Sequence, residues 1–243
     1  MSFLSRKQLD ELIRFAFYAD TEARSDLIHG FIKDENDYTS HFTSALRRNI
    51  NSYSQSGLSA TSFLLPHIEE RELGGDATII ISRGNESKVA ILEAKLPRFT
   101  SVNYQWDYNQ TASGVSHFSD QLERQTRWSG TFAIFEMFYC EYPFGKQPAF
   151  LDDRGSSCVW HEDAQNFRAS RSNPDHVWSQ GELQTLLQQN GTNIPSVMYQ
   201  FGECAKGKVI RMAQPEAIGR EFRLPPRILA ITAALERNAR RRS

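Results

Sequence analysis

The sequence has few cysteines, almost no net charge and no long run of apolar residues. Its three cysteines, Cys140, Cys158 and Cys204, are odd in number and widely spaced, which argues against a disulfide framework or a zinc site and favours a reducing cytoplasm. A formal net charge of −1 excludes a global basic field, so any surface for nucleic acid has to be local. Without an apolar run or a signal-peptide core, we expect a cytoplasmic protein with no membrane partner.

The residues that are abundant indicate a globular protein. Apolar residues make up 40% of the 243 residues and aromatic residues make up 12%, which suits a protein with a substantial core. A chain of this length can form one large α/β domain, or one domain with an appended subdomain. The sequence contains neither internal repeats nor a linker long enough to force two domains, so length and composition leave both organisations open.

A β-hairpin is the clearest local prediction. Two β-rich runs, residues 77–82 and 88–92, flank a Gly-Asn dipeptide at residues 84–85, and such a dipeptide commonly closes tight hairpins. With the turn centred there, Ile80 faces Val89. Apolar residues occupy both faces of both runs, which indicates a strand pair inside a sheet that is covered on both sides.

The same register brings three charged side chains to one end of the hairpin. Asp76 stands opposite Glu93, and Lys95 shares the face of Glu93 because strand side chains alternate. Opposed carboxylates repel each other, so we expect a divalent cation between them. Carboxylate oxygens suit Mg²⁺, and a nearby lysine can orient a metal-activated water or offset charge on phosphorus. A Glu-x-Lys pattern is also common on solvent-facing strands, and that interpretation stays open.

An aspartate followed by Glu-x-Lys on the next strand resembles the PD-(D/E)xK nuclease superfamily. The resemblance covers Asp76, Glu93 and Lys95 directly and residues 35–125 more loosely, with Gly75 in the place of the motif's proline. It implies an α/β fold with a restriction-endonuclease-like core, in which helices flank a central mixed β-sheet. It further implies a hydrolase of the deoxyribonuclease class.

The function implied by the resemblance is metal-dependent endonucleolytic cleavage of phosphodiester bonds in DNA, in restriction, defence or repair. Asp76, Glu93 and the backbone carbonyl of Ala94 would ligate Mg²⁺, with Mn²⁺ as an alternative, and Lys95 would assist the attacking water. Cutting both strands with one site per chain implies a homodimer or a larger assembly. Two alternatives remain: a ribonuclease, or a catalytically idle scaffold of the same fold for nucleic-acid binding or protein assembly.

Two further residues are expected to complete the catalytic site. Glu35 precedes the first strand, where many superfamily members carry an acidic residue on a helix; Asp37 is the alternative, and either residue could simply favour the start of that helix. Gln121 follows the Glu-x-Lys strand, as a glutamine does in some subfamilies, although Gln125 stands where several of these have an aromatic residue. Arg124 shares the helical face of Gln121 and is a weaker candidate for phosphate contact.

Periodicity and turn residues predict the remaining elements. Helices are expected over residues 5–18, 36–52, 116–128 and 180–189 and from Pro225 through Leu235. Strands are expected over residues 62–68, 77–82, 88–95 and 131–141, near Cys158, and over residues 196–204 and 208–212. Residues 1–142 would form the nuclease core with its N-terminal helices. Residues 143–243 would form an additional α+β segment packed on the core, for recognition or dimerisation.

Overall fold

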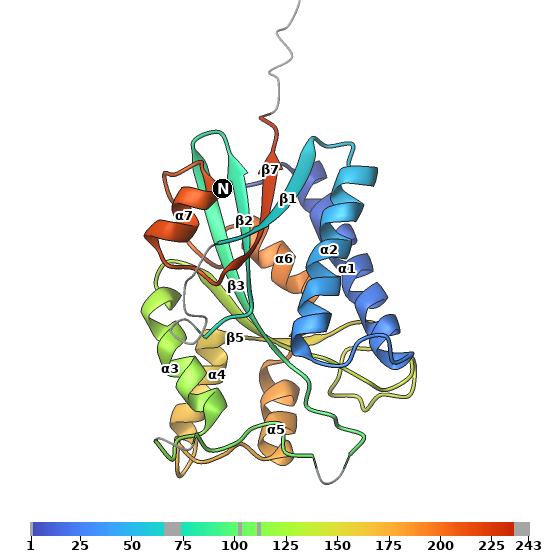
Figure 1. Ribbon diagram of the computed structural model, residues 1–243, viewed down its shortest axis with the longest axis vertical. Helices are drawn as coiled ribbons and strands as arrows, with labels where there is room; N and C mark the ends of the chain where they lie inside the picture. The colour runs from blue at the N-terminus through green and yellow to red at the C-terminus, as the bar shows by residue number, and fades with distance from the viewer. Residues whose placement is uncertain (1, 66–73, 102–103, 111–112, 236–243) are drawn as a thin grey trace, which may run out of the picture.

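The computed structural model describes residues 2–65, 74–101, 104–110 and 113–235. This part of the chain forms an α/β protein with one seven-stranded mixed sheet and seven helices (Figure 1). The strands lie in the order β1-β7-β2-β3-β4-β5-β6. None of the described helices combines the length and apolar character needed to span a lipid bilayer.

The elements have the following bounds. The helices are α1 (Arg6–Ile28), α2 (Glu35–Tyr53), α3 (His117–Ser129), α4 (His161–Ser170), α5 (Gln180–Asn190), α6 (Ile194–Gly202) and α7 (Pro215–Glu221). The strands are β1 (Leu58–Leu64), β2 (Ala77–Arg83), β3 (Glu86–Lys95), β4 (Ala133–Phe138), β5 (Ser157–Trp160), β6 (Thr192–Asn193) and β7 (Arg227–Ala233).

The predicted hairpin forms the centre of the sheet. Strands β2 and β3 are antiparallel, and Ile80 pairs with Val89 as the turn position requires. The ladder ends at Ala77, which pairs with Leu92, and the backbone N–H of Asp76 extends it by donating to the carbonyl of Leu92 at 2.9 Å. Parallel neighbours then flank the hairpin, because β7 pairs with β2 and β4 pairs with β3.

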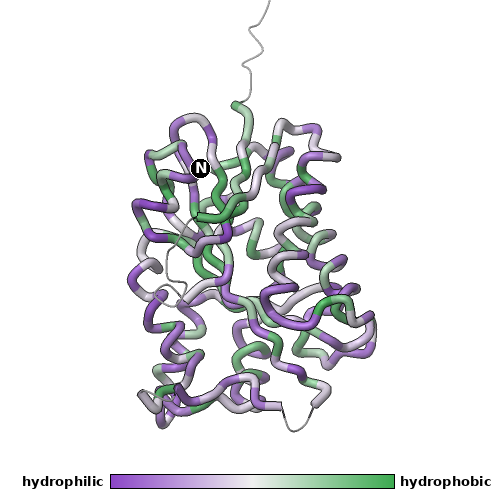
Figure 2. Tube along the Cα trace, in the orientation of Figure 1, coloured by the Kyte–Doolittle hydropathy of each residue, from purple (hydrophilic) through white to green (hydrophobic). Residues whose placement is uncertain are grey.

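Helices cover both faces of this hairpin, as the apolar pattern predicts. In Figure 1, α1 and α2 stand on one side of the sheet and α3 and α4 on the other. Ala77, Ile79 and Leu92 belong to the core that includes α1, α2 and α6, whereas Ile80 and Val89 belong to a core that includes α7. Figure 2 shows the central strands as mainly apolar and the outer faces as more hydrophilic. Charged residues at the end of β3 therefore sit at the edge of an apolar environment.

The helices nearest the hairpin begin where the sequence predicts. The side chain of Ser5 caps α1, that of Asp34 caps α2 and that of Ser116 caps α3, each by accepting a hydrogen bond from a backbone N–H of the first turn. Helix α1 continues to Ile28, well beyond the predicted end. Strand β1 begins at residue 58 rather than 62, and residues 66–68 of the predicted strand lie outside the described part of the chain.

Two strands predicted in the last third of the chain are wrong. Residues 194–202 form α6 rather than a strand, because Ile194, Val197, Met198 and Phe201 recur at helical spacing and are all buried on one face. Residues 208–212 form no strand in the described chain; only an isolated bridge joins Ile210 to β3.

The predicted C-terminal helix is also wrong, because residues 227–233 form strand β7. It lies between β1 and β2, antiparallel to the first and parallel to the second. Residues Ile228–Ile231 are buried on both faces, and a short apolar run of this kind is compatible with either a strand or a buried helix. The division into a core of residues 1–142 and an accessory segment of residues 143–243 stays a prediction, and both parts supply strands to one sheet.

Candidate catalytic site

The candidate site lies at the end of the β2–β3 hairpin. Asp76 directly precedes β2, and Glu93 and Lys95 are near the end of β3. The Lys95 ammonium lies 2.6 Å from Oε1 of Glu93, and these side chains belong to residues that are only 5% and 2% exposed. Asp76 joins them through its Oδ2 atom, which accepts a hydrogen bond of 2.7 Å from the backbone N–H of Ala94. The structure thus brings together the three residues that the hairpin register predicts.

The backbone of Ala94 is available at the same place. In a strand the N–H and C=O groups of one residue point to the same side. The N–H of Ala94 points to Asp76, so its carbonyl also lies on the edge of β3 that faces Asp76, beyond the last paired residue of β2. Two carboxylates and one carbonyl therefore border a common space.

Glu35 and Gln121 approach this hairpin end from opposite faces of the sheet. Glu35 is the first residue of α2, and its Oε1 atom accepts a hydrogen bond of 2.8 Å from the backbone N–H of Leu96, directly after β3. Gln121 on α3 donates its side-chain amide to Oε1 of Glu93. The structure therefore places both predicted residues beside the hairpin end.

The alternative candidates make other contacts. Asp37 accepts a hydrogen bond of 3.3 Å from the backbone N–H of Lys33, so it contributes to the start of α2. Arg124 forms an ion pair of 3.0 Å with Asp120 one turn earlier on α3. Among the acidic residues at the start of α2, Glu35 is therefore the one that reaches the end of β3.

Burial and charge perturb the titration of this cluster. Burial raises the pKa of Asp76 well above its ordinary value, the carboxylate of Glu93 raises it further, and Lys95 opposes both effects. Burial also raises the pKa of Glu35, again against the effect of Lys95. Burial alone would lower the pKa of Lys95, but the three carboxylates together raise it. Lys95 therefore stays protonated at neutral pH and acts as a hydrogen-bond donor rather than as a base.

The carboxylate and carbonyl oxygens at the hairpin end are the kind of ligand that a hard divalent cation prefers. The carboxyl groups of Glu93, Glu35 and Asp76 all raise the pKa of Lys95, so one ammonium lies near three carboxyl groups. When all three are ionised, two negative charges remain unbalanced. Mg²⁺ is bound through carboxylate and carbonyl oxygens and keeps several waters, so two protein carboxylates suffice. The described residues contain no group of three or more His, Cys, Asp or Glu side chains arranged as a complete metal cluster.

A second buried polar cluster lies on the neighbouring strand and was missed from the sequence. Glu136 on β4 pairs in register with Glu93 and is fully buried, and among the described residues neither of its carboxylate oxygens has a partner at hydrogen-bond distance. His161 Nδ1 lies 3.7 Å from Oε1 of Glu136 and 2.9 Å from Oε1 of Gln125. Burial raises the pKa of Glu136, and His161 offsets part of this effect. A single acidic residue in the middle of the apolar run of residues 132–140 was the available signal.

His161 and Gln125 both belong to this cluster. His161 is buried against Glu136 and Gln125. Gln125 donates its amide to the carbonyl of Gly74, two residues before Asp76. Through Gln125, this cluster therefore holds the backbone that leads into β2 from the side of α3.

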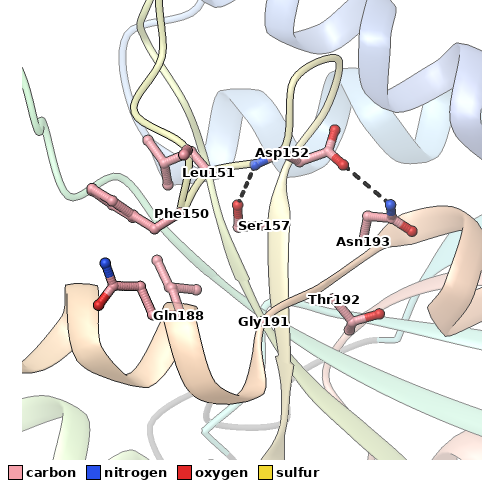
Figure 3. Close-up of a pocket in the computed structure, with 10 residues that line it drawn as sticks. Phe150, Leu151, Asp152, Ser157, Gln188, Gly191, Thr192 and Asn193 are labelled. Carbon is pink, nitrogen blue, oxygen red and sulfur yellow. Dashed lines mark hydrogen bonds between the residues drawn. The ribbon is translucent and has the colours of Figure 1, made fainter.

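A concave site with a volume of about 460 Å³ lies elsewhere, between residues 149–152, α5 and β6 (Figure 3). Its polar side chains largely satisfy each other: the N–H of Asp152 donates to Ser157 at 2.8 Å, and Oδ2 of Asp152 accepts from Asn193 at 3.1 Å. The described residues that line it include none of the predicted catalytic residues. The chemistry therefore points to the hairpin end and not to this concavity.

No protein family model, curated protein or solved structure matches this chain. The assignment of a function therefore depends on the geometry of the hairpin end and on the chemistry of its residues.

Proposed function

We propose that this protein is a metal-dependent nuclease of the PD-(D/E)xK type that hydrolyses phosphodiester bonds in DNA, in restriction, defence or repair. The observation that carries the proposal is the convergence of Asp76, Glu93 and Lys95 at the end of the β2–β3 hairpin. The surrounding order supports a restriction-endonuclease-like core: α2 precedes the hairpin, α3 follows it, and β4 lies parallel to β3.

Each residue has a role that its contacts support. Asp76, Glu93 and the carbonyl of Ala94 would hold Mg²⁺, which would polarise a phosphoryl oxygen and activate a coordinated water. Lys95 carries three N–H donors, so it can keep its contact with Glu93 and also donate to the attacking water or to a phosphate oxygen. Glu35 would hold a further water of the metal, since it lies at the end of β3, where it accepts a hydrogen bond from Leu96 and interacts with Lys95 and Glu93.

A cleavage assay with variants tests the proposal. Purified protein is incubated with plasmid, linear duplex, single-stranded DNA and RNA in Mg²⁺, in Mn²⁺ and in EDTA. We expect cleavage that EDTA abolishes and that Asp76→Asn and Lys95→Met each reduce by at least about 10²-fold. Asp10→Asn, an exposed acidic residue on α1, is the matched control and should cleave as the wild type does. Activity that persists in both site variants would overturn the assignment. Cleavage of RNA alone would identify the ribonuclease alternative.

The idle-scaffold alternative has one observation in its favour. Glu93 already pairs with Lys95 at 2.6 Å, so that carboxylate is satisfied without a metal. Titration calorimetry separates the two functions, because the proposed nuclease must bind Mg²⁺ or Mn²⁺ and Asp76→Ala must weaken this binding. Absence of metal binding in the wild type would favour the scaffold.

A further inference from the structure

A concave site with a volume of about 540 Å³ opens between residues 104–109, which precede α3, and residues 176–180, which lead into α5. This volume lies within the range of small-molecule and nucleotide sites. Tyr104, Trp106 and Tyr108 line one wall, and Trp178 and Gln180 line the other.

Two of the aromatic side chains are exposed and held in place. Tyr108 is 54% exposed, and its ring stacks on that of His117 with centroids 4.7 Å apart and planes at 14°. Tyr104 is 40% exposed, and the guanidinium carbon of Arg98 lies 5.7 Å from the centre of the Tyr104 ring. Ordered, exposed aromatic rings beside a cationic side chain are the features on which unpaired bases stack.

The walls of the concavity are tied to one another and to the start of α3. The carboxylate of Asp107 accepts hydrogen bonds from the hydroxyl of Ser116 at 2.6 Å, the N–H of Phe118 at 3.0 Å and the N–H of Trp178 at 2.8 Å. The indole N–H of Trp178 donates to Ser119 on α3 at 3.0 Å. A rigid wall of this kind lowers the entropic cost of binding.

The concavity is adjacent to the candidate catalytic site through His117. The N–H of His117 donates to the carbonyl of Tyr108 at 2.8 Å. On α3, His117 lies one turn before Gln121, whose amide contacts Glu93. Burial and then the charge of Lys95 lower the pKa of His117, and Glu93 opposes this effect.

We propose that this concavity binds an unpaired nucleobase of the substrate strand, stacked on Tyr108, while the neighbouring phosphodiester lies at Glu93 and Lys95. This inference rests on the proposed nuclease function and specifies its substrate as a single-stranded or locally unpaired nucleic acid. Every base has a π-face, so stacking makes the contact tolerant of sequence.

Binding without cleavage tests the inference. Affinity for a single-stranded oligonucleotide and for the matching duplex is measured by fluorescence anisotropy in EDTA. Tyr108→Leu should weaken single-strand binding by about tenfold and change duplex binding little, whereas Tyr108→Phe should retain it. Tyr199→Leu, on the exposed part of α6, is the matched control and should bind as the wild type does. A 2-aminopurine scan along the strand should show quenching at one position, lost in Tyr108→Leu.

The outcomes separate this inference from the nuclease proposal. Failure of the wild type to bind single strands, equal affinity in Tyr108→Leu and wild type, or the same loss in Tyr199→Leu would each overturn the stacking site. Tight binding of a free nucleoside monophosphate without strand binding would also overturn it and identify a small-ligand site. A protein that binds strands through Tyr108 but never cleaves them defeats the nuclease proposal alone.

Discussion

Gln121 donates its side-chain amide to Oε1 of Glu93, the same oxygen that Lys95 contacts at 2.6 Å. Two donors from two different elements, α3 and β3, thus hold one carboxylate oxygen. Oε2 is the atom through which we expect Glu93 to ligate a metal. A carboxylate whose orientation is fixed by neighbouring donors binds metal better than a mobile one.

Replacing Gln121 with leucine should reduce turnover by about 10- to 100-fold, because Glu93 loses one of the donors that orient it. The Mg²⁺ concentration that gives half-maximal activity should rise as well. Both quantities come from cleavage rates measured over a metal titration. Gln189→Leu, an exposed glutamine on α5, is the control. A Gln121→Leu variant with unchanged metal dependence would remove the residue from the site.

Replacing Glu35 with glutamine should lower turnover by about tenfold without loss of folding. Glutamine keeps an acceptor for the N–H of Leu96, so the contact between α2 and β3 survives while the negative charge disappears. The measurement pairs cleavage rate with the melting temperature. Asp37→Asn provides the comparison, since Asp37 contacts Lys33 and not the end of β3. Unchanged turnover in Glu35→Gln would show that Glu35 only anchors the helix.

The stability of the protein should fall as pH rises through 6, partly because of Asp20. Burial raises the pKa of this carboxyl from 3.8 to about 6, although Ser156 and Tyr38 donate hydrogen bonds to it. A folded-state pKa above the unfolded value means that the contribution to stability is full below about pH 4 and is lost as pH rises through 6. The loss by pH 7 is on the order of 3 kcal/mol.

Asp20→Asn isolates this contribution. The amide places a donor where the carboxylate accepts from Ser156, so the variant should be less stable at low pH. Its unfolding free energy should nevertheless decline less between pH 4 and pH 7 than that of the wild type. Urea unfolding at several pH values measures both slopes, and parallel curves for the two proteins would contradict the assignment.

Gly75→Ala should destabilise the fold by about 1–3 kcal/mol, because overpacking at this position has no room to relax. A Cβ atom on Gly75 would lie 2.6 Å from Cγ2 of Ile91 and 3.0 Å from Cγ of Pro225. The control is Gly130→Ala at the end of α3, where a Cβ would meet no atom within 4 Å and the backbone is already helical. Chemical denaturation of both variants checks the difference; equal stabilities would contradict it.

The hairpin and the residues at its end were predictable because the relevant information is local. A turn at Gly84 sets the register of every pair in β2 and β3, and that register also determines which charged side chains meet. The convergence of Asp76, Glu93 and Lys95 needs no knowledge of the rest of the chain. Their chemical role stays a prediction.

Elements that depend on distant partners were not predictable in the same way. The run at residues 228–231 becomes a strand because β1 and β2 supply hydrogen-bonding neighbours on both sides, and periodicity alone did not reveal this. Helix α6 carried a usable local signal, since Asn193 caps it and Pro195 lies in its first turn. Glu136 could be recognised as unusual, but its position beside Glu93 follows only from the parallel pairing of β3 and β4.

Strand β7 is the last of the described strands in chain order. Its partners β1 and β2 are synthesised early. However, Leu58 pairs with Ala233 and Thr78 pairs with Ile228, so the sheet closes only when residues 227–233 are present. Pairings between such distant segments form late in folding. A chain still attached to the ribosome therefore carries Asp76, Glu93 and Lys95 on an incomplete sheet. The sheet around these residues is complete only after residues 227–233 have been synthesised and have paired with β1 and β2.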